Sequence, residues 1–294
     1  MGEVNKKKLL VIGIKGMAGH VLYNYFSKIS DYDVFGLARG VVETKNIFNL
    51  DVIDVSKLRE LISKHRFDIV VNCIGILNKD AEDNPSKAIW FNSYFPHFLE
   101  EITKDSKTKV IHISTDCVFS GKDLGGNYTE VSFKNGEGFY AQSKALGELN
   151  NNKDVTIRTS IIGPEINSKG IGLFHWFMSQ SDELTLKGFS KAYWSGITTF
   201  ELAKVIDEII KQNIVGLIQV AATSKIDKYT LLQLFNKIYK KGIINIEKND
   251  SYVIDKSLKS IRKDFQYEVP SYDLMLEEQL QWIYDNEELY KHYM

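Results

Sequence analysis

The stretch LLVIGIKGMAG, residues 9–19, joins an unbroken apolar run to three glycines spaced three residues apart. Leu9–Ile14 lacks the polar alternation of a half-exposed strand and is typical of a strand buried on both faces. Directly after the glycines, apolar residues recur at helical spacing from His20 to Ile29. Strand, glycine turn and helix in this order predict the first unit of a dinucleotide-binding sheet, whose turn approaches a pyrophosphate at the amino end of the helix.

The rest of the first half repeats strand and helix patterns. Apolar runs predict further strands at Asp33–Ala38, Asn46–Leu50, Phe67–Gly75, Lys109–Thr115 and Asp154–Ser160. Helical spacing predicts helices at Val55–His65 and from Asn84 to Leu99. Unbroken strands that alternate with helices predict an α/β fold with a Rossmann-type doubly wound parallel sheet.

The composition is that of an ordinary globular chain, with 44% of its 294 residues hydrophobic and 26% charged. A formal net charge of -1 provides no basic field for nucleic acid. Two cysteines are too few for a disulfide scaffold and are expected to be free cytosolic thiols. Because no apolar run approaches the roughly 18 residues of a membrane span, we expect a cytoplasmic protein without membrane contact.

The charges near the glycine turn bear on the choice of cofactor. The second predicted strand ends at Arg39, at the point where an acid would bind ribose hydroxyls and an arginine accommodates a 2′-phosphate. Lys15 adds a cation inside the turn. We therefore expect NADPH, with NADH as the second choice; the alternative is that both cations are ordinary exposed charges. Asp51, after the third predicted strand, either meets the adenine or caps the following turn.

Tyr140 and Lys144 are four residues apart in a segment that favours a helix, so their side chains share one helix face. A neighbouring cation favours the phenolate form of a tyrosine and brings it towards proton transfer at neutral pH. The alternative is a solvated lysine packed along a tyrosine ring. The other candidate residues along the chain favour the catalytic interpretation.

Polar and small residues follow two of the predicted strands. Gly75 ends the fourth strand where a cofactor backbone would pass, and Thr115 places a hydroxyl at the carboxyl end of the fifth, where open α/β sheets bind ligands. Asn92 is an isolated polar residue on the predicted helix, either bonded to a neighbour or part of the active site. His112, inside the fifth strand, is expected in the core or at an edge rather than in catalysis.

Together these segments resemble an extended short-chain dehydrogenase/reductase and, within that superfamily, the dTDP-4-dehydrorhamnose reductase family. The similarity covers nearly the whole chain and is densest in its first half. The matching segments are Gly13–Gly19, Asp80–Glu82, Asn92–Ser93 with Pro96, Ser114–Gly121, Tyr128–Glu130, Tyr140–Lys144 and Gly147–Glu148.

The resemblance implies a role for each catalytic residue. Tyr140 would donate the proton to the substrate carbonyl oxygen, Lys144 would hold the nicotinamide ribose hydroxyls and favour the phenolate, and Thr115 would hydrogen-bond the reacting oxygen. Hydride would come from the cofactor. The implied reaction is reduction of the 4-keto group of a nucleotide-linked 6-deoxyhexose, serving deoxysugar and surface polysaccharide biosynthesis.

Three other functions agree less well with the sequence. The related sugar-nucleotide 4,6-dehydratases follow Ser-Thr-Asp with a glutamate base, whereas this chain has Cys117, so the resemblance argues against elimination. Epimerases of the superfamily reuse the same tyrosine and lysine and stay an alternative, although Asp116–Phe119 is not their small-residue stretch. A non-catalytic NADP-binding regulatory subunit is the other alternative, but it has no physical need for the phenol of Tyr140.

The chain after residue 165 is expected to form a smaller C-terminal substrate-binding lobe, so the predicted domains are 1–165 and 166–294, with some later segments returning to the Rossmann domain. Helices are expected at Leu173–Ser179, Phe200–Lys211, Thr230–Lys240 and from Ser271 to about Tyr290, and a strand at Leu217–Ala221. The aromatic residues Phe174, Trp176, Phe177 and Trp194 are expected mostly in the core, with stacking on a base or sugar as the alternative.

Two departures from the family pattern leave the sugar and its nucleotide open. The proline and glycine that usually flank the catalytic tyrosine are replaced by Gly138, Phe139 and Ala141, and the segment Asp-Gln-x-Gly-x-Pro-Thr appears as Tyr193–Thr199. No metal site is expected, and a homodimer is a base-rate expectation. The predicted cofactor contacts are Gly13, Lys15, Gly16, Met17, Ala18, Gly19, Arg39, Asp51, Cys73, Ile74, Gly75, Tyr140, Lys144 and Ile162. The predicted substrate contacts are Asn92, Thr115, Asp116, Trp194 and Thr198.

Overall fold

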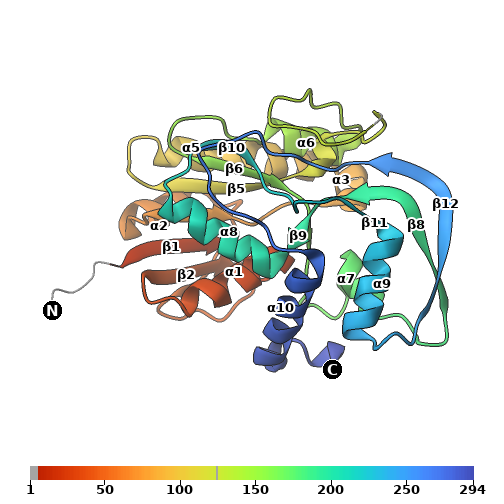
Figure 1. Cartoon of the computed structure of the whole chain (residues 1–294). Coiled ribbons are helices and arrows are strands. Elements are labelled where there is room, and N and C mark those ends of the chain that lie inside the picture. The colour runs from red at the N-terminus through yellow and green to blue at the C-terminus, as the bar shows by residue number, and fades with distance from the viewer. Residues whose placement is uncertain (1–5, 124) are drawn as a thin grey trace. The chain divides into compact units, whose positions relative to one another are not determined.

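The computed structural model describes residues 6–123 and 125–294 (Figure 1). The chain divides into two compact units, each assembled from separate segments. Unit 1 comprises Met1–Ser114, Gly138–Ile157 and Asn213–Ile218, and unit 2 comprises Thr115–Glu137, Arg158–Gln212 and Gln219–Met294. The predicted domain boundary at residue 165 stays a prediction.

A seven-stranded sheet with the strand order β10-β6-β5-β4-β1-β2-β3 forms the centre of unit 1. β1 pairs in parallel with β2 and with β4, and the pairs β2–β3 and β4–β5 are parallel as well. Because the strand order proceeds in both directions from β1, the predicted doubly wound parallel sheet is confirmed. The strands are β1 (Lys7–Ile12), β2 (Tyr32–Ala38), β3 (Ile47–Asn49), β4 (Ile69–Asn72), β5 (Lys109–Thr115), β6 (Val155–Thr159) and β10 (Gly216–Gln219).

The helices of unit 1 bury apolar side chains against this sheet. Leu58 and Ile62 of α2, with Phe98 and Leu99 of α5, belong to one buried cluster that also contains Leu10 and other strand residues. These helices are α1 (Met17–Ser27), α2 (Val55–His65), α3 (Asn78–Asp83), α4 (Pro85–Ala88), the π-helical segment η1 (Ile89–Tyr94), α5 (Phe95–Thr103) and α6 (Gly138–Leu146).

Two parts of unit 1 differ from the sequence-based prediction. The single helix expected from Asn84 to Leu99 is interrupted by η1, where the backbone widens to π-helical hydrogen bonding. Helix α3 was not predicted, because Ala81 is the one apolar residue among its six.

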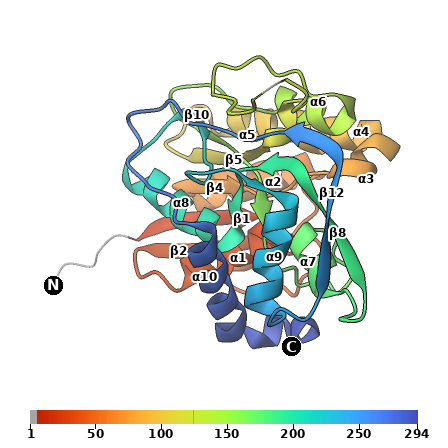
Figure 2. The same ribbon diagram turned by 45° about the vertical axis from the view of Figure 1, so that its right-hand side comes forward.

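Unit 2 contains a three-stranded sheet with the order β11-β8-β12, in which the long strands β8 and β12 run parallel (Figure 2). Its remaining elements are helices, short strands and 3-10 turns. The elements are η2 (Asp116–Val118), β7 (Ile161–Ile162), α7 (Leu173–Met178), β8 (Thr185–Trp194), β9 (Ile197–Thr198), α8 (Thr199–Lys211), β11 (Ile226–Asp227), α9 (Lys228–Tyr239), β12 (Asn245–Asp255), α10 (Tyr272–Asp285), η3 (Glu287–Leu289) and η4 (Lys291–Tyr293).

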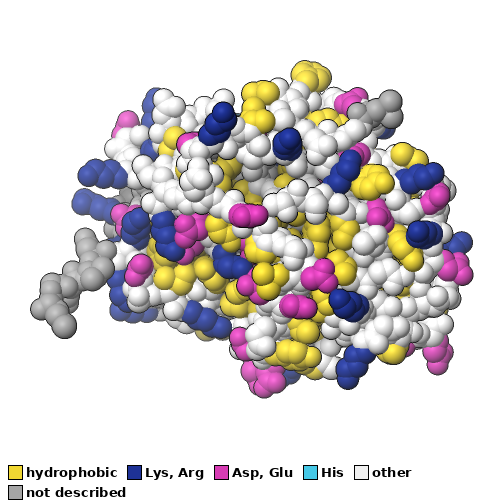
Figure 3. All heavy atoms as spheres, viewed as in Figure 1, with side chains coloured by type: hydrophobic (Ala, Val, Ile, Leu, Met, Phe, Trp, Pro, Cys, Tyr) yellow, Lys and Arg dark blue, Asp and Glu magenta, His cyan; other side chains and the backbone are white. Residues whose placement is uncertain are grey.

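The expected last helix ends earlier than predicted, at Asp285, and is followed by two 3-10 turns. On the face drawn in Figure 3, basic and acidic side chains are intermixed, as the near-zero net charge suggests. No helix in the described ranges has the length and apolarity that crossing a bilayer demands.

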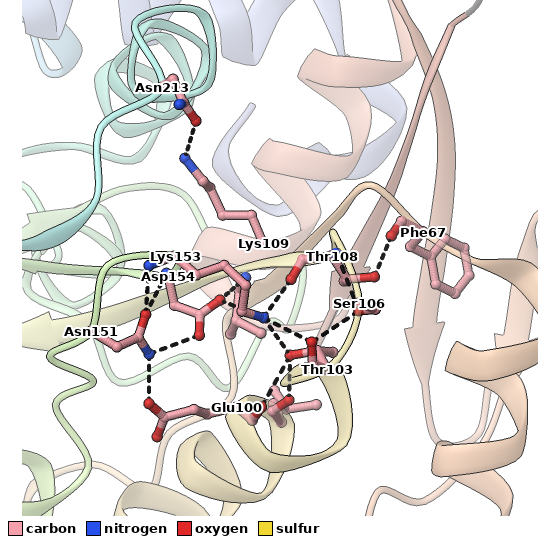
Figure 4. Close-up of polar contacts among 12 residues, drawn as sticks. Phe67, Glu100, Thr103, Ser106, Thr108, Lys109, Asn151, Lys153, Asp154 and Asn213 are labelled. Carbon is pink, nitrogen blue, oxygen red and sulfur yellow. Dashed lines mark hydrogen bonds and ion pairs between the residues drawn. The ribbon is translucent and has the colours of Figure 1, made fainter.

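A polar network around the buried side chain of Asp154 joins the starts of β5 and β6 in unit 1 (Figure 4). The Asp154 carboxylate accepts the backbone N–H of Val110 at 2.8 Å and the side-chain amide of Asn151 at 2.9 Å. Lys153 pairs with Asp154 at 3.2 Å, and its ammonium also donates to the carbonyls of Thr103 and Thr108 at 3.0 and 2.7 Å. The network therefore fixes the amino ends of two central strands to the end of α5.

We predict that Asp154→Ala lowers the free energy of unfolding by about 2–4 kcal/mol, because the Val110 amide and the Lys153 ammonium lose a buried acceptor. Urea unfolding followed by circular dichroism measures the loss. Asp83→Ala is the matched control, since it removes an exposed ion pair with Lys79 and should cost less than about 0.5 kcal/mol. Equal losses in the two variants would contradict the role given to the network.

Candidate active site

The glycine turn between β1 and α1 depends on glycine at its first and last positions. Gly13 has a φ of +96°, and a Cβ at Gly19 would lie 2.2 Å from the Gly13 carbonyl oxygen. Gly16, the N-cap of α1, provides no side-chain cap, and the first turn of the helix carries no acid. The turn thus brings the backbone close to the amino end of α1 and leaves that end without a competing negative charge, which suits an anionic ligand.

The two predicted cofactor cations lie beside this turn. The Lys15 ammonium donates to the carbonyls of Arg39 and Gly40 at 3.5 and 3.3 Å. The exposed Arg39 guanidinium forms an ion pair with Asp51 at 3.3 Å. Asp51 also accepts the N–H of Ile53 at 3.2 Å, so it caps the turn after β3 and at the same time orients Arg39.

The segment Cys73–Gly75 follows β4 and passes close to both the turn and α6. A Cβ at Gly13 would lie 3.1 Å from Cγ1 of Ile74, and a Cβ at Gly75 would lie 3.9 Å from Nζ of Lys144. Burial raises the pKa of the Cys73 thiol to about 12, so this thiol is neutral. Unit 1 therefore brings the glycine turn, the end of β4 and Lys144 together at the carboxyl edge of the sheet.

Helix α6 carries Tyr140 and Lys144 one turn apart. Lys144 is 4% exposed, and its ammonium donates to the Ile113 carbonyl at 2.6 Å. Burial lowers the pKa of Lys144 to about 8, against the opposing effect of the Glu148 carboxylate. His112 is fully buried beside it, with Nε2 3.4 Å from the ammonium, and is a core residue as predicted.

Both ends of α6 are fixed by residues from α3 and η1. The Glu82 carboxylate accepts the N–H groups of Phe139 and Tyr140 at 3.0 and 3.1 Å, satisfying two free amides at the amino end of the helix. At the other end, a Cβ at Gly147 would lie 1.8 Å from the Asn92 carbonyl oxygen, so only glycine permits this approach.

Asn92 itself is fully buried, and its side chain is used within unit 1. Its Oδ1 accepts the backbone N–H of Ile76 at 2.8 Å. Its Nδ2 donates to the carbonyl of Ile76 at 2.9 Å and to the hydroxyl of Ser143 at 3.0 Å. These contacts give Asn92 a positioning role between the loop after β4 and α6, while its predicted contact with substrate stays a prediction.

In unit 2, Thr115 and Asp116 form the start of the 3-10 turn η2. The Thr115 hydroxyl accepts the N–H of Cys117 at 3.1 Å and donates to the Asp116 carboxylate at 3.1 Å. Burial raises the pKa of Asp116, with Lys256 and Lys228 opposing the shift. Burial and the charge of Asp116 raise the pKa of the Cys117 thiol to about 11.

Asp116 and Trp194 line a cavity of about 520 Å³ that lies entirely within unit 2. The indole N–H of Trp194 donates to the Ser160 hydroxyl at 2.7 Å. Trp176 is 40% exposed on the cavity wall, whereas Phe174, Phe177 and Trp194 are buried, so three of the four aromatic residues lie in the core, as expected.

The other two predicted residues of unit 2 are internal. Ile162 pairs with Thr198 between β7 and β9, and both are nearly inaccessible. The Thr198 hydroxyl accepts the N–H of Glu201 at 3.1 Å and is the N-cap of α8. Their predicted contacts with cofactor and substrate stay predictions.

Sequence reasoning missed three charged residues with defined places in the structure. Glu82 caps the amino end of α6, and Lys228 and Lys256 line the cavity of unit 2. Glu82 stood within a segment that matched the family, but its partner amides are more than fifty residues away along the chain. Nothing local to Lys228 or Lys256 distinguishes them from surface lysines, because their shared cavity is formed by distant segments.

Comparison with known proteins identifies the family. The family model described as RmlD substrate binding domain matches residues 7–229. A probable low-salt glycan biosynthesis reductase of Haloferax volcanii is 32% identical over 103 residues, 35% of this chain and 34% of that protein. A dTDP-4-dehydrorhamnose reductase of Mycolicibacterium smegmatis is 28% identical over 148 residues, 50% of this chain and 42% of that protein. The matched stretches thus span less than half the length of these curated relatives.

Solved structures agree over almost the whole chain. The structure of a hypothetical dTDP-4-dehydrorhamnose reductase from Sulfolobus tokodaii has a TM-score of 0.75 at 25% identity, covering 91% of this chain and 98% of that one. A dTDP-glucose 4,6-dehydratase from Bacillus anthracis has a TM-score of 0.77 at 16% identity, covering 98% of this chain and 100% of that one, so the fold alone does not separate reductase from dehydratase. With the match to its family model extending over three quarters of the sequence, the chain belongs to the RmlD substrate binding domain family and is an extended short-chain dehydrogenase/reductase, as the sequence predicted.

Proposed function

We propose that this protein is an NADPH-dependent reductase of the 4-keto group of a nucleotide-linked 6-deoxyhexose, similar to dTDP-4-dehydrorhamnose reductase and serving deoxysugar and surface polysaccharide biosynthesis. The observation that carries the proposal is the placement of Tyr140 and Lys144 one turn apart on α6, with the ammonium of Lys144 buried against the Ile113 carbonyl. A cation held at this point favours the phenolate that forms when Tyr140 gives up its proton.

The residues around the glycine turn fit the proposed cofactor. The space that a Cβ at Gly19 would occupy is taken by the Gly13 carbonyl, and the uncapped amino end of α1 suits a pyrophosphate. Arg39, oriented by Asp51 and close to Lys15, is the proposed partner of a 2′-phosphate. Bound NADPH would supply the hydride.

The chain's own residues would then perform the proton chemistry. Tyr140 donates its phenolic proton to the carbonyl oxygen, and Lys144 holds the ribose hydroxyls and stabilises the phenolate. Thr115 orients the carbonyl oxygen. Its hydroxyl proton points to Asp116 in this structure, so this role requires the hydroxyl to rotate toward the substrate.

Cys117 supports reduction over elimination. A dehydratase needs a base that removes the proton on carbon 5, but burial and the neighbouring Asp116 charge raise the pKa of the Cys117 thiol to about 11. At neutral pH this thiol is protonated and cannot act as that base. The unpaired state of Cys73 and Cys117 agrees with the proposed cytoplasmic location, and a homodimer stays a prediction.

The direct test follows NADPH absorbance with a 4-keto-6-deoxy sugar nucleotide generated in place by a dehydratase, offered in dTDP and UDP forms. We expect oxidation by the wild type and a loss of turnover of about 10²–10⁴-fold in Tyr140→Phe, because the proton donor is gone. NADPH binding should stay within about threefold. Tyr94→Phe, at an exposed tyrosine of η1, is the matched control. Unchanged turnover in Tyr140→Phe would refute the assignment, and a wild type that binds NADPH but oxidises none would favour the regulatory subunit.

For the cofactor preference, we predict that Arg39→Ala weakens NADPH about 10–100-fold and NADH by less than about threefold, because a charge-assisted hydrogen bond to the 2′-phosphate is lost. Fluorescence titration of both nucleotides measures the two dissociation constants. Arg59→Ala, which removes an exposed arginine paired with Glu101, should change neither. Equal weakening of both nucleotides by Arg39→Ala would remove the basis for preferring NADPH.

A further inference from the structure

The cavity of unit 2 has an uneven distribution of charge and aromatic side chains. Among the side chains that line it, three are lysines and one is a carboxylate, Asp116. The lining residues are Asp116, Cys117, Ser160, Leu173, Trp176, Lys187, Phe189, Ala192, Tyr193, Trp194, Lys228, Leu232, Tyr252, Ile254 and Lys256. The formal excess is two positive charges, which balances the two negative charges of a diphosphate linking a nucleoside to a sugar.

Lys228, the first residue of α9, is the most constrained of the three lysines. Its ammonium lies 4.6 Å from the centre of the Trp194 ring, and no hydrogen-bond acceptor for it occurs in the described part of the chain. Burial lowers the pKa of Lys228 to about 8, with the Asp116 charge opposing the shift. Lys228 is partly buried, and an ammonium that contacts a ring but no hydrogen-bond acceptor gains from an anion that completes its contacts.

Lys256 brings a second ammonium to the same end of the cavity. It follows directly after β12, and its charge opposes the rise in pKa that burial causes at Asp116 and at the Cys117 thiol. The negative charge of Asp116 is therefore compensated by two nearby cations, Lys228 and Lys256. An incoming anion meets a net positive charge at this end rather than a carboxylate alone.

The rest of the cavity wall is largely aromatic and has few hydrogen-bonding side chains that could recognise the edge of a base. Phe189 and Tyr252 contact each other with ring centres 5.3 Å apart, and Trp176 and Tyr193 are also partly exposed there. No asparagine or glutamine occurs among the lining residues. Stacking on aromatic rings tolerates different bases, because every base has a π face.

We propose that Lys228 and Lys256 bind the diphosphate of the substrate in this cavity, while the nucleobase stacks on the aromatic wall, so that the protein recognises nucleoside diphosphates with little selection between thymine and uracil. This inference rests on the nucleotide-sugar substrate of the proposed function. It adds the two residues that bind the diphosphate of the substrate, and it explains why the protein would select only weakly between bases.

Isothermal titration calorimetry with dTDP, dUDP and thymidine tests the proposal without requiring turnover. In the wild type, dTDP and dUDP, which differ only by the methyl group of the base, should bind within about tenfold of each other, since a single methyl group is worth about 1 kcal/mol. Lys228→Met should weaken both by about 10–100-fold, because a contact to a charged group is lost, and should leave thymidine unaffected. Lys228→Arg keeps the charge and should restore most of the affinity.

Lys248→Met is the matched control. Lys248 is also a lysine over an aromatic ring, 5.3 Å from the centre of Tyr229, but it does not line the cavity. Its substitution should leave both affinities unchanged. Unaltered NADPH binding in Lys228→Met shows that the variant is folded, so a loss of dTDP affinity is then a property of the cavity.

Two results would overturn the proposal: wild-type affinity for dTDP in a folded Lys228→Met variant, or a preference of more than about 100-fold for one base in the wild type. Failure of the proposed function gives a different pattern. In that case dTDP and dUDP still bind through Lys228, but no 4-keto sugar nucleotide is reduced.

Discussion

The hydrogen bond from the Lys144 ammonium to the Ile113 carbonyl, 2.6 Å long and almost fully buried, is the constraint on which the candidate active site depends. A lysine without water needs its remaining donors satisfied, so its surroundings must be held in place. Glu82 holds the amino end of α6, and Asn92 and Gly147 hold the other. The proposed catalytic pair, Tyr140 and Lys144, is therefore held in place by the packing of α6 as well as by the one-turn spacing of its members.

Close backbone approaches make this arrangement possible, and each requires glycine. A Cβ at Gly19 would overlap the Gly13 carbonyl, and one at Gly147 would overlap the carbonyl of Asn92. The first approach leaves the amino end of α1 open for a phosphate, and the second lets α6 lie against η1. At the opposite edge of the sheet, the hydrogen bonds and the ion pair of Asp154 connect the starts of β5 and β6.

The first half of the fold was predictable because its signals are local. The predicted helix Val55–His65 and strand Lys109–Thr115 match α2 and β5 residue for residue. Strands β8 and β12 were missed for physical reasons. The buried positions of β8 include Gly188, where a Cβ would lie 2.6 Å from the Cα of Tyr229, so the apolar stripe of the strand is interrupted in its middle. In β12, a polar run from Glu247 to Asp250 and a break in register conceal the alternation. Lys228 and the other residues that distant segments bring to one cavity could not be predicted, because the sequence around each of them does not mark it as a site residue.

The measurement that tests this account most directly is the pKa of Lys144 itself. Nuclear magnetic resonance titration of ¹³C-labelled lysine side chains, with the Lys144 signal assigned by its absence in Lys144→Met, reports the value without substrate or cofactor. The account predicts a pKa of about 8, lowered by burial, so that the ammonium is charged at neutral pH and loses its proton as the pH rises through that value. A pKa near the 10.5 of an exposed lysine would show that the ammonium is solvated, and it would contradict the buried catalytic cation on which the proposed function rests.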